Sequence, residues 1–166
     1  MGCTHGGRGH RIDGSETSVV RKHPPPKEPI VRHVMCMFEN NRRRWLNQDK
    51  AGDRDPEGIW YRAWLKTLKG ESVIRDGTFH VEMYRIERTP DNTVDRTLVS
   101  DWIYRTDRVG RIGQPGWLGD GYVLALRWAT KDIAGSEIEI ITTFEDDYGR
   151  TARSETYRMR VPKYSF

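Results

Sequence analysis

Three stretches near the end of the chain decide the fold: Tyr122-Val-Leu-Ala-Leu-Arg-Trp128, Glu137-Ile-Glu-Ile-Ile-Thr-Thr-Phe144 and Tyr157-Arg-Met-Arg-Val161. In each stretch apolar residues recur at alternate positions, which places them on one face of an extended strand. A tight-turn sequence, Asp146-Asp-Tyr-Gly-Arg150, follows the second stretch. The pattern predicts antiparallel strands that each bury one face.

The same texture of short apolar runs and turn residues extends back to Ile30. It is typical of an all-β domain, and we expect an immunoglobulin-like antiparallel β-sandwich of about seven strands. Helix formers gather only in Asn40 to Lys50, where we expect at most one or two turns. The predicted strands are Ile30 to Phe38, Ile59 to Lys66, Thr78 to Glu87, Arg96 to Tyr104, Tyr122 to Thr130, Glu137 to Phe144 and Ala152 to Val161.

The chain divides into two parts by composition. Residues 1–29 contain five Gly and four Pro with little to bury, so we expect a disordered tail that ends in an extended proline spacer. Residues 30–166 form the predicted domain. Two long connections interrupt it, Glu39 to Gly58 and Thr106 to Gly121, and loops of that length often carry function.

The formal net charge of +4 is spread over both parts. The tail holds five Lys/Arg against three Asp/Glu, and residues 30–166 hold 23 against 21, so each part carries +2. Neither part is a strongly basic nucleic-acid-binding domain. The sequence has no apolar window long enough for a membrane helix and no familiar nucleophile, zinc-protease, Walker or dinucleotide motif.

The closing strands and the start of the chain carry a resemblance. Tyr122 to Trp128, Glu137 to Ile141 and Phe144 to Arg150 resemble the last strands of immunoglobulin-like bacterial surface domains. With the Gly2-Cys3 pair and the proline spacer, the chain resembles a small bacterial lipoprotein of uncharacterised type. The resemblance implies lipidation at Cys3, with contact to a membrane only through that lipid. It places the protein in the cell envelope or outside the cell, and without lipidation we expect a cytoplasmic protein.

The second cysteine, Cys36, lies inside an apolar run, and neither cysteine has a neighbour at metal-binding or redox spacing. We expect a buried free thiol at Cys36. A bridge between Cys3 and Cys36 stays open at this point.

Arginines gather in the two long loops, and planar guanidinium groups suit phosphate, sulfate or carboxylate groups. Aromatic residues nearby would allow stacking on bases or sugars. Surface salt bridges to neighbouring aspartates are the competing interpretation. The candidate anion-binding residues are Arg42, Arg43, Arg44, Arg105, Arg108 and Arg111.

Carboxylates alternate in Asp53-Arg-Asp-Pro-Glu57, as in the first half of a calcium loop. The twelfth position, where a bidentate Glu is expected, is Trp64. Asp53, Asp55 and Glu57 are therefore candidate ligands for Ca²⁺ only if another loop contributes, and a solvated acidic turn is the alternative. We expect no other cofactor.

These patterns predict a non-enzymatic, tethered binding or structural module of a cell envelope or a larger assembly. Its partner would be a protein or an anionic polymer, and the oligomeric state is left open. One alternative is anion or nucleic-acid binding through the two arginine-bearing loops. The other is a small hydrolase that uses loop-borne carboxylates such as Asp53, Asp55 and Asp146.

Overall fold

The computed structural model describes residues 28–39, 44–46, 56–114, 116–128 and 133–163. Strands and a single short 3₁₀ turn, η2 (Gly116–Leu118), are the regular elements of this described part. The predicted all-β class is confirmed. The strands are β1 (Val31–Phe38), β2 (Trp45–Leu46), β3 (Gly58–Thr67), β4 (Ser72–Val73), β5 (Gly77–Arg88), β6 (Val94–Arg105), β7 (Gly110–Gln114), β8 (Gly119–Arg127), β9 (Glu137–Asp146), β10 (Thr151–Arg153) and β11 (Tyr157–Arg160).

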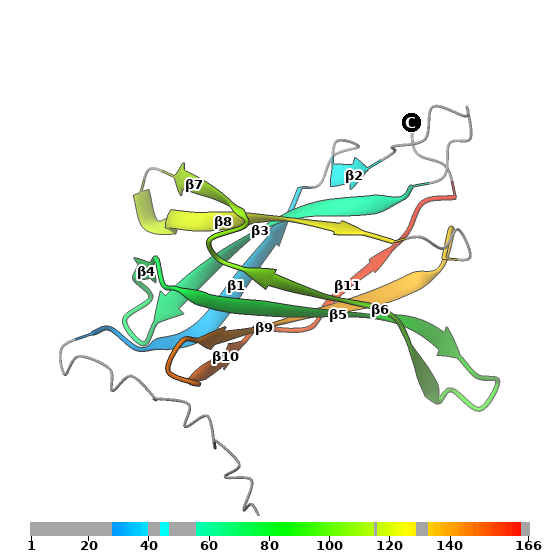
Figure 1. Ribbon diagram of the computed structural model, residues 1–166. Helices are drawn as coiled ribbons and strands as arrows, with labels where there is room; N and C mark the ends of the chain where they lie inside the picture. Colours follow the sequence, from blue (N-terminus) through cyan, green and yellow to red (C-terminus); the bar gives the residue numbers. More distant parts are fainter. Residues whose placement is uncertain (1–27, 40–43, 47–55, 115, 129–132, 164–166) are drawn as a thin grey trace, which may run out of the picture.

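All the described strands belong to one curled sheet with the order β6-β5-β9-β10-β1-β3-β8-β7 (Figure 1). β11 pairs with β9, while β2 and β4 pair with β3. Neighbours run antiparallel except β1 and β10, which are parallel where His33 lies opposite Arg153. The immunoglobulin-like strand arrangement expected from the sequence stays a prediction.

The curl brings β6 back to β8, although these strands are not neighbours in the backbone ladder. Trp102 Nε1 on β6 donates to the Arg127 carbonyl at 2.9 Å. The Tyr104 hydroxyl donates to the Ala125 carbonyl at 2.7 Å. Both acceptors lie on the part of β8 beyond its pairing with β7, which ends at Val123. Side chains therefore close the sheet where a backbone ladder does not.

The alternation in the sequence correctly predicts which residues fill the interior. Ile59, Tyr61, Ala63 and Leu65 of β3 are all fully buried. The apolar faces predicted for β8, β9 and β11 are buried as well. Tyr157 is the exception, because it is half-buried at the edge of the core. The buried residues of these faces are Tyr122, Leu124, Leu126, Trp128, Ile138, Ile140, Thr142, Phe144, Met159 and Val161.

The structure corrects two boundaries. The predicted strand from Ala152 to Val161 is two strands, because β10 pairs with Thr143 to Glu145 and β11 pairs with Glu137 to Ile140. Between them the chain turns at Ser154, whose N–H donates to the Thr142 carbonyl at 2.8 Å. β9 thus has two short partners along one edge instead of one long partner.

The predicted loop from Thr106 to Gly121 also contains strand structure. β7 and the start of β8 form a hairpin in which Arg111 lies opposite Tyr122. Glycine is depleted in strands, so the glycine-rich composition of this segment does not predict a strand. The backbone groups of β7 and β8 nevertheless form a ladder. Among the described residues of the predicted helical stretch Asn40 to Lys50, Trp45 and Leu46 are extended and pair with β3.

The end of the predicted tail contacts the domain. Residues 1–27 lie outside the described residues, but Glu28 and Pro29 contact Arg75. The division into residues 1–29 and 30–166 stays a prediction. No helix in the described part of the chain has the length and apolar character needed to cross a membrane.

Candidate functional site

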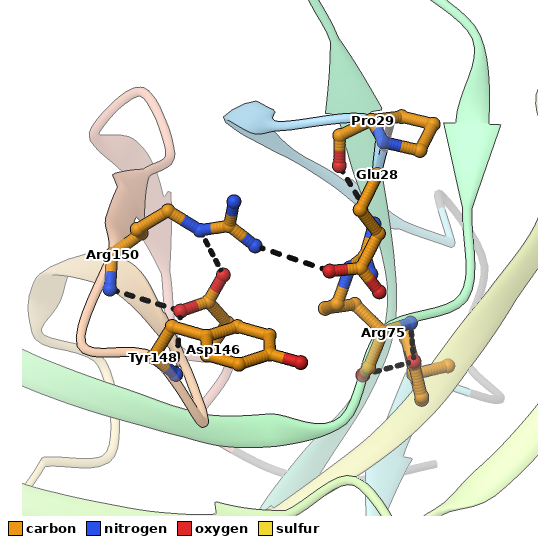
Figure 2. Close-up of polar contacts among 7 residues, drawn as sticks. Glu28, Pro29, Arg75, Asp146, Tyr148 and Arg150 are labelled. Carbon is orange, nitrogen blue, oxygen red and sulfur yellow. Dashed lines mark hydrogen bonds and ion pairs between the residues drawn. The ribbon is translucent and has the colours of Figure 1, made fainter. Parts of the chain in front are cut away.

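A pocket of about 430 Å³ opens near the start of β1. Its walls come from four separate segments: the residue Glu28, the connection before β5, strand β7, and the turn between β9 and β10. The lining residues are Glu28, Ile74, Arg75, Asp76, Arg111, Asp147 and Tyr148. Figure 2 shows the polar contacts that hold Glu28 beside two arginines of this region.

Strand register brings two of these segments together. Gly77, at the start of β5, lies opposite Asp146, at the end of β9. A side chain at Gly77 would come within 2.7 Å of the Phe144 ring, so only glycine allows this close approach. Arg75 therefore lies beside the turn that carries Arg150.

Arg75 is held in place by Tyr122 from β8. The Arg75 N–H donates to the Tyr122 hydroxyl at 3.0 Å, and that hydroxyl donates to the Arg75 carbonyl at 2.9 Å. Burial raises the pKa of Tyr122 above its ordinary value, so the neutral hydroxyl needed for both bonds is the stable form. The Arg75 side chain is itself only 9% exposed.

The carboxylate of Glu28 lies between two guanidinium groups (Figure 2). One oxygen, Oε1, is ion-paired with Arg75 Nη1. The other, Oε2, is 3.5 Å from Arg150 Nη2. Arg75 Nη2 donates to the Pro29 carbonyl at 2.6 Å, so Arg75 binds both the side chain of Glu28 and the next carbonyl of the chain.

Arg150 is positioned by the turn between β9 and β10. Asp146 accepts backbone N–H bonds from Tyr148 at 3.0 Å and from Arg150 at 2.9 Å. Its second oxygen, Oδ2, is 2.5 Å from Arg150 Nε. The guanidinium also lies over the Tyr148 ring, 5.2 Å from the centroid. With Nε bound to Asp146, the Nη2 end points to Glu28.

Hydrogen-bonding capacity is left over at this site. Arg75 Nε, Arg150 Nη2 and Glu28 Oε2 are all buried and have no hydrogen-bond partner among the residues that the structure describes. Buried polar groups in this condition are unusual and carry a desolvation cost. The contacts to Glu28 therefore leave both arginines incompletely satisfied.

Charge around the pocket is balanced only while Glu28 is present. The charged groups that line the pocket or directly contact its lining are four arginines and four carboxylates: Arg75, Arg105, Arg111, Arg150, Glu28, Asp76, Asp146 and Asp147. Without the Glu28 carboxylate, this set has four cations against three anions. A carboxylate from elsewhere would restore the balance.

The described members of the two predicted arginine clusters lie apart in the structure. Arg111 lines the pocket, and Arg105 is 3.4 Å from Asp147 at its rim. Arg108 is exposed in the turn between β6 and β7. Arg44 lies 5.1 Å from the centroid of the Trp45 ring, beside the start of β3, whereas the pocket is near the other end of that strand. Arg42 and Arg43 lie outside the described residues.

The predicted cation loop cannot be assembled from the described residues. Asp53 and Asp55 lie outside them, as does Cys3. Glu57 is described. Its backbone N–H donates to the Leu46 carbonyl at the end of β2, and its carbonyl accepts from the Trp128 N–H just after β8. In the described ranges, no group of three or more His, Cys, Asp or Glu side chains is placed to hold a metal ion.

Cys36 is a free thiol that packs against the core, half-buried. Burial of the sulfur raises the pKa of Cys36 from its ordinary 9.0 to about 11, although hydrogen bonds from Thr142 and Ser154 lower it in part. The thiol is therefore protonated at neutral pH and poorly suited to nucleophilic chemistry.

Comparison with known proteins adds little to this site. No family model matches the chain, and no curated protein is similar to it in sequence. A crystal structure described as a DUF4466 family protein from Parabacteroides merdae ATCC 43184 matches with a TM-score of 0.36 and 8% identity. The match covers 81% of this chain and 46% of that one, so the chain spans about half the length of that protein. No catalytic family is indicated.

Proposed function

We propose that the chain is a non-enzymatic, tethered binding module that takes an anionic group of its partner in the pocket between Arg75, Arg111 and Arg150. The observation that carries the proposal is the convergence of Arg75 and Arg150 on one carboxylate while each keeps a buried nitrogen without a hydrogen bond. Planar guanidinium groups bind carboxylates with two parallel bonds, which gives both strength and direction.

The size of the pocket supports binding of a small group or a short segment. Ligand sites in proteins usually enclose about 300–1,000 Å³, and this pocket falls within that range at about 430 Å³. Tyr122 fixes the backbone of Arg75, and Asp146 fixes the side chain of Arg150, before any ligand arrives. Such preorganisation lowers the ordering cost of association.

The carboxylates near the pocket favour binding over hydrolysis. The Asp146 carboxylate is occupied by Arg150 and two backbone N–H groups, and Asp147 lies within ion-pair distance of Arg105. A general acid or base needs a carboxylate free to exchange a proton with substrate. Asp146, one of the three carboxylates that the hydrolase alternative invoked, is therefore poorly suited to act as a general acid or base.

Tethering remains part of the proposal. The tail resembles a lipoprotein spacer, and Glu28 at its end is bound at the pocket. We propose that the domain is held on a cell envelope or within a larger assembly and presents this pocket to a protein partner.

The test is a calorimetric titration with a short peptide that carries one glutamate between neutral residues, carried out on the full chain and on its Glu28→Gln variant at physiological salt. We expect micromolar to millimolar binding in at least one of the two. Arg150→Gln should weaken it about tenfold or more, because a charge-assisted pair typically contributes about 1.5–3 kcal/mol.

The matched control is Arg160→Gln. Arg160 is exposed on β11 opposite Glu137, and the length of β9 places it roughly 30 Å from Asp146. The control removes the same charge far from the pocket and should leave the affinity unchanged. Equal weakening by Arg150→Gln and Arg160→Gln, or no binding to either chain, would contradict the proposed site.

A further inference from the structure

We propose that Glu28 is an internal occupant of the pocket, and that the partner is an acidic, extended peptide segment that replaces it. The inference rests on the proposed function and deepens it by naming the ligand class and the group that competes with it. Glu28 thereby makes the pocket self-inhibited until a partner segment displaces it.

The contacts of Arg75 identify a peptide as the preferred ligand. Its Nη1 binds the side-chain carboxylate of Glu28, and its Nη2 binds the main-chain carbonyl of the next residue, Pro29. A free phosphate or carboxylate ion could meet both nitrogens of Arg75 with its own oxygens. A peptide in which an acidic residue is followed by an accessible carbonyl presents the two acceptors with the spacing that Glu28 and Pro29 have.

The rim of the pocket disfavours dense polyanions. Asp76 and Asp147 line the same cavity as the arginines. A nucleic acid or a sulfated polysaccharide would place several negative charges near these carboxylates, and like charges at such distances repel. A single carboxylate on a peptide meets Arg75 and Arg150 while its neutral neighbours pass the rim.

Few contacts hold Glu28, and an incoming carboxylate can therefore replace it. It comes three residues before the first residue of β1, and the two residues between them, Pro29 and Ile30, are exposed. Its Oε2 lies 3.5 Å from Arg150 Nη2 without forming a hydrogen bond. An incoming carboxylate that comes closer to Arg150 would make the bond that Glu28 does not make.

Covalent attachment gives Glu28 an advantage over any free peptide. A group joined to its site by a short segment competes at an effective concentration of about millimolar. A free ligand must overcome that competition, so its apparent affinity falls in proportion to the fraction of unoccupied pockets. Removing the Glu28 charge should therefore reveal the intrinsic affinity.

The test uses the full chain and a fluorescein-labelled peptide with the sequence Pro-Lys-Glu-Pro-Ile of residues 26–30, with binding followed by anisotropy. We expect Glu28→Gln to bind this peptide about tenfold or more tightly than the parent chain. Adding Arg150→Gln to Glu28→Gln should reverse the gain. The same peptide with Gln in place of Glu should bind neither chain.

Glu155→Gln is the matched control, because it removes an exposed carboxylate beyond β10. It should leave the peptide affinity at the parent value. Equal affinities for the parent and Glu28→Gln would overturn the internal-occupant inference while leaving the proposed function in place. No binding of this peptide or of the single-glutamate peptide to either chain would overturn both. Preferential binding of heparin over the peptide by Glu28→Gln would also overturn the assigned ligand class.

Discussion

The hydroxyl of Tyr104 on β6 donates a hydrogen bond to the main-chain carbonyl of Ala125 on β8, with 2.7 Å between the two oxygens. Among the described strands, β6 forms its backbone ladder with β5 alone. The Tyr104 bond therefore joins two strands that share no backbone ladder with each other. Trp102 makes the equivalent bond to Arg127. The curled shape of the sheet therefore depends at this seam on two side chains.

Tyr104→Phe tests the seam. The substitution keeps the ring and removes the donor, so the Ala125 carbonyl loses its partner. We expect the free energy of unfolding to fall by about 0.5–1.5 kcal/mol, measured by urea denaturation. Tyr157→Phe serves as the control, because Tyr157 is held by ring stacking on Phe38 at 4.1 Å, and it should change stability little. A Tyr104→Phe chain as stable as the parent would show that the seam bond contributes nothing.

Trp128 should anchor the core just after the end of β8. It is 5% exposed, donates from Nε1 to the Pro56 carbonyl at 2.9 Å, and packs edge-on against Trp45. Trp128→Ala should cost about 3–5 kcal/mol of stability. Trp128→Phe keeps much of the buried area but loses the donor, and we expect a smaller loss. Similar stabilities for Trp128→Ala and the parent would mean that the residue does not belong to the core.

The raised pKa of Cys36 predicts a loss of folding stability at alkaline pH. Its pKa is 9.0 in an exposed chain and about 11 in the folded protein, so the folded state favours the protonated thiol. Stability from this group is complete below pH 9 and falls as the pH rises toward 11, because the unfolded chain loses its proton first. Denaturation between pH 8 and pH 11 should show a weaker pH dependence in Cys36→Ala than in the parent. Identical slopes would contradict the assigned pKa.

The core was predictable because the alternation of apolar residues within each strand identifies the face that is buried. The alternation of Ile59, Tyr61 and Ala63 is readable from the residues themselves, and the structure buries all three. β7 was not predictable from the same signal, since the glycines of Gly110–Gln114 leave few side chains to show a period. The division of the last predicted strand into β10 and β11 depends on how both pair with β9, which is a long-range property.

The site was less predictable for the same reason. Arg150 lies in a segment that the sequence identifies as a turn, Arg75 lies between two predicted strands, and Glu28 lies in the predicted tail. What brings the two arginines together is the pairing of Gly77 with Asp146. Local patterns do not specify that register. They indicate the arginine-rich loops instead, of which Arg111 contributes directly to the pocket.

Thermal melts provide a separate test of the occupied pocket. Glu28→Gln leaves the buried Arg75 without its ion-pair partner, so its stability should fall by about 1–3 kcal/mol. The Pro-Lys-Glu-Pro-Ile peptide should raise the melting temperature of Glu28→Gln, because a ligand that binds only the folded state stabilises it. The parent should respond less at the same peptide concentration. An equal rise in both chains would argue against competition by Glu28.

The most direct measurement follows the arginine Nε–Hε resonances of the ¹⁵N-labelled Glu28→Gln chain by NMR during titration with the same peptide. We expect progressive shifts of the Arg75 and Arg150 signals, because a carboxylate enters between their side chains, while the signal of the remote Arg160 stays in place. If saturating peptide leaves Arg75 and Arg150 unshifted, or shifts all three signals alike, this pocket does not bind a partner's carboxylate.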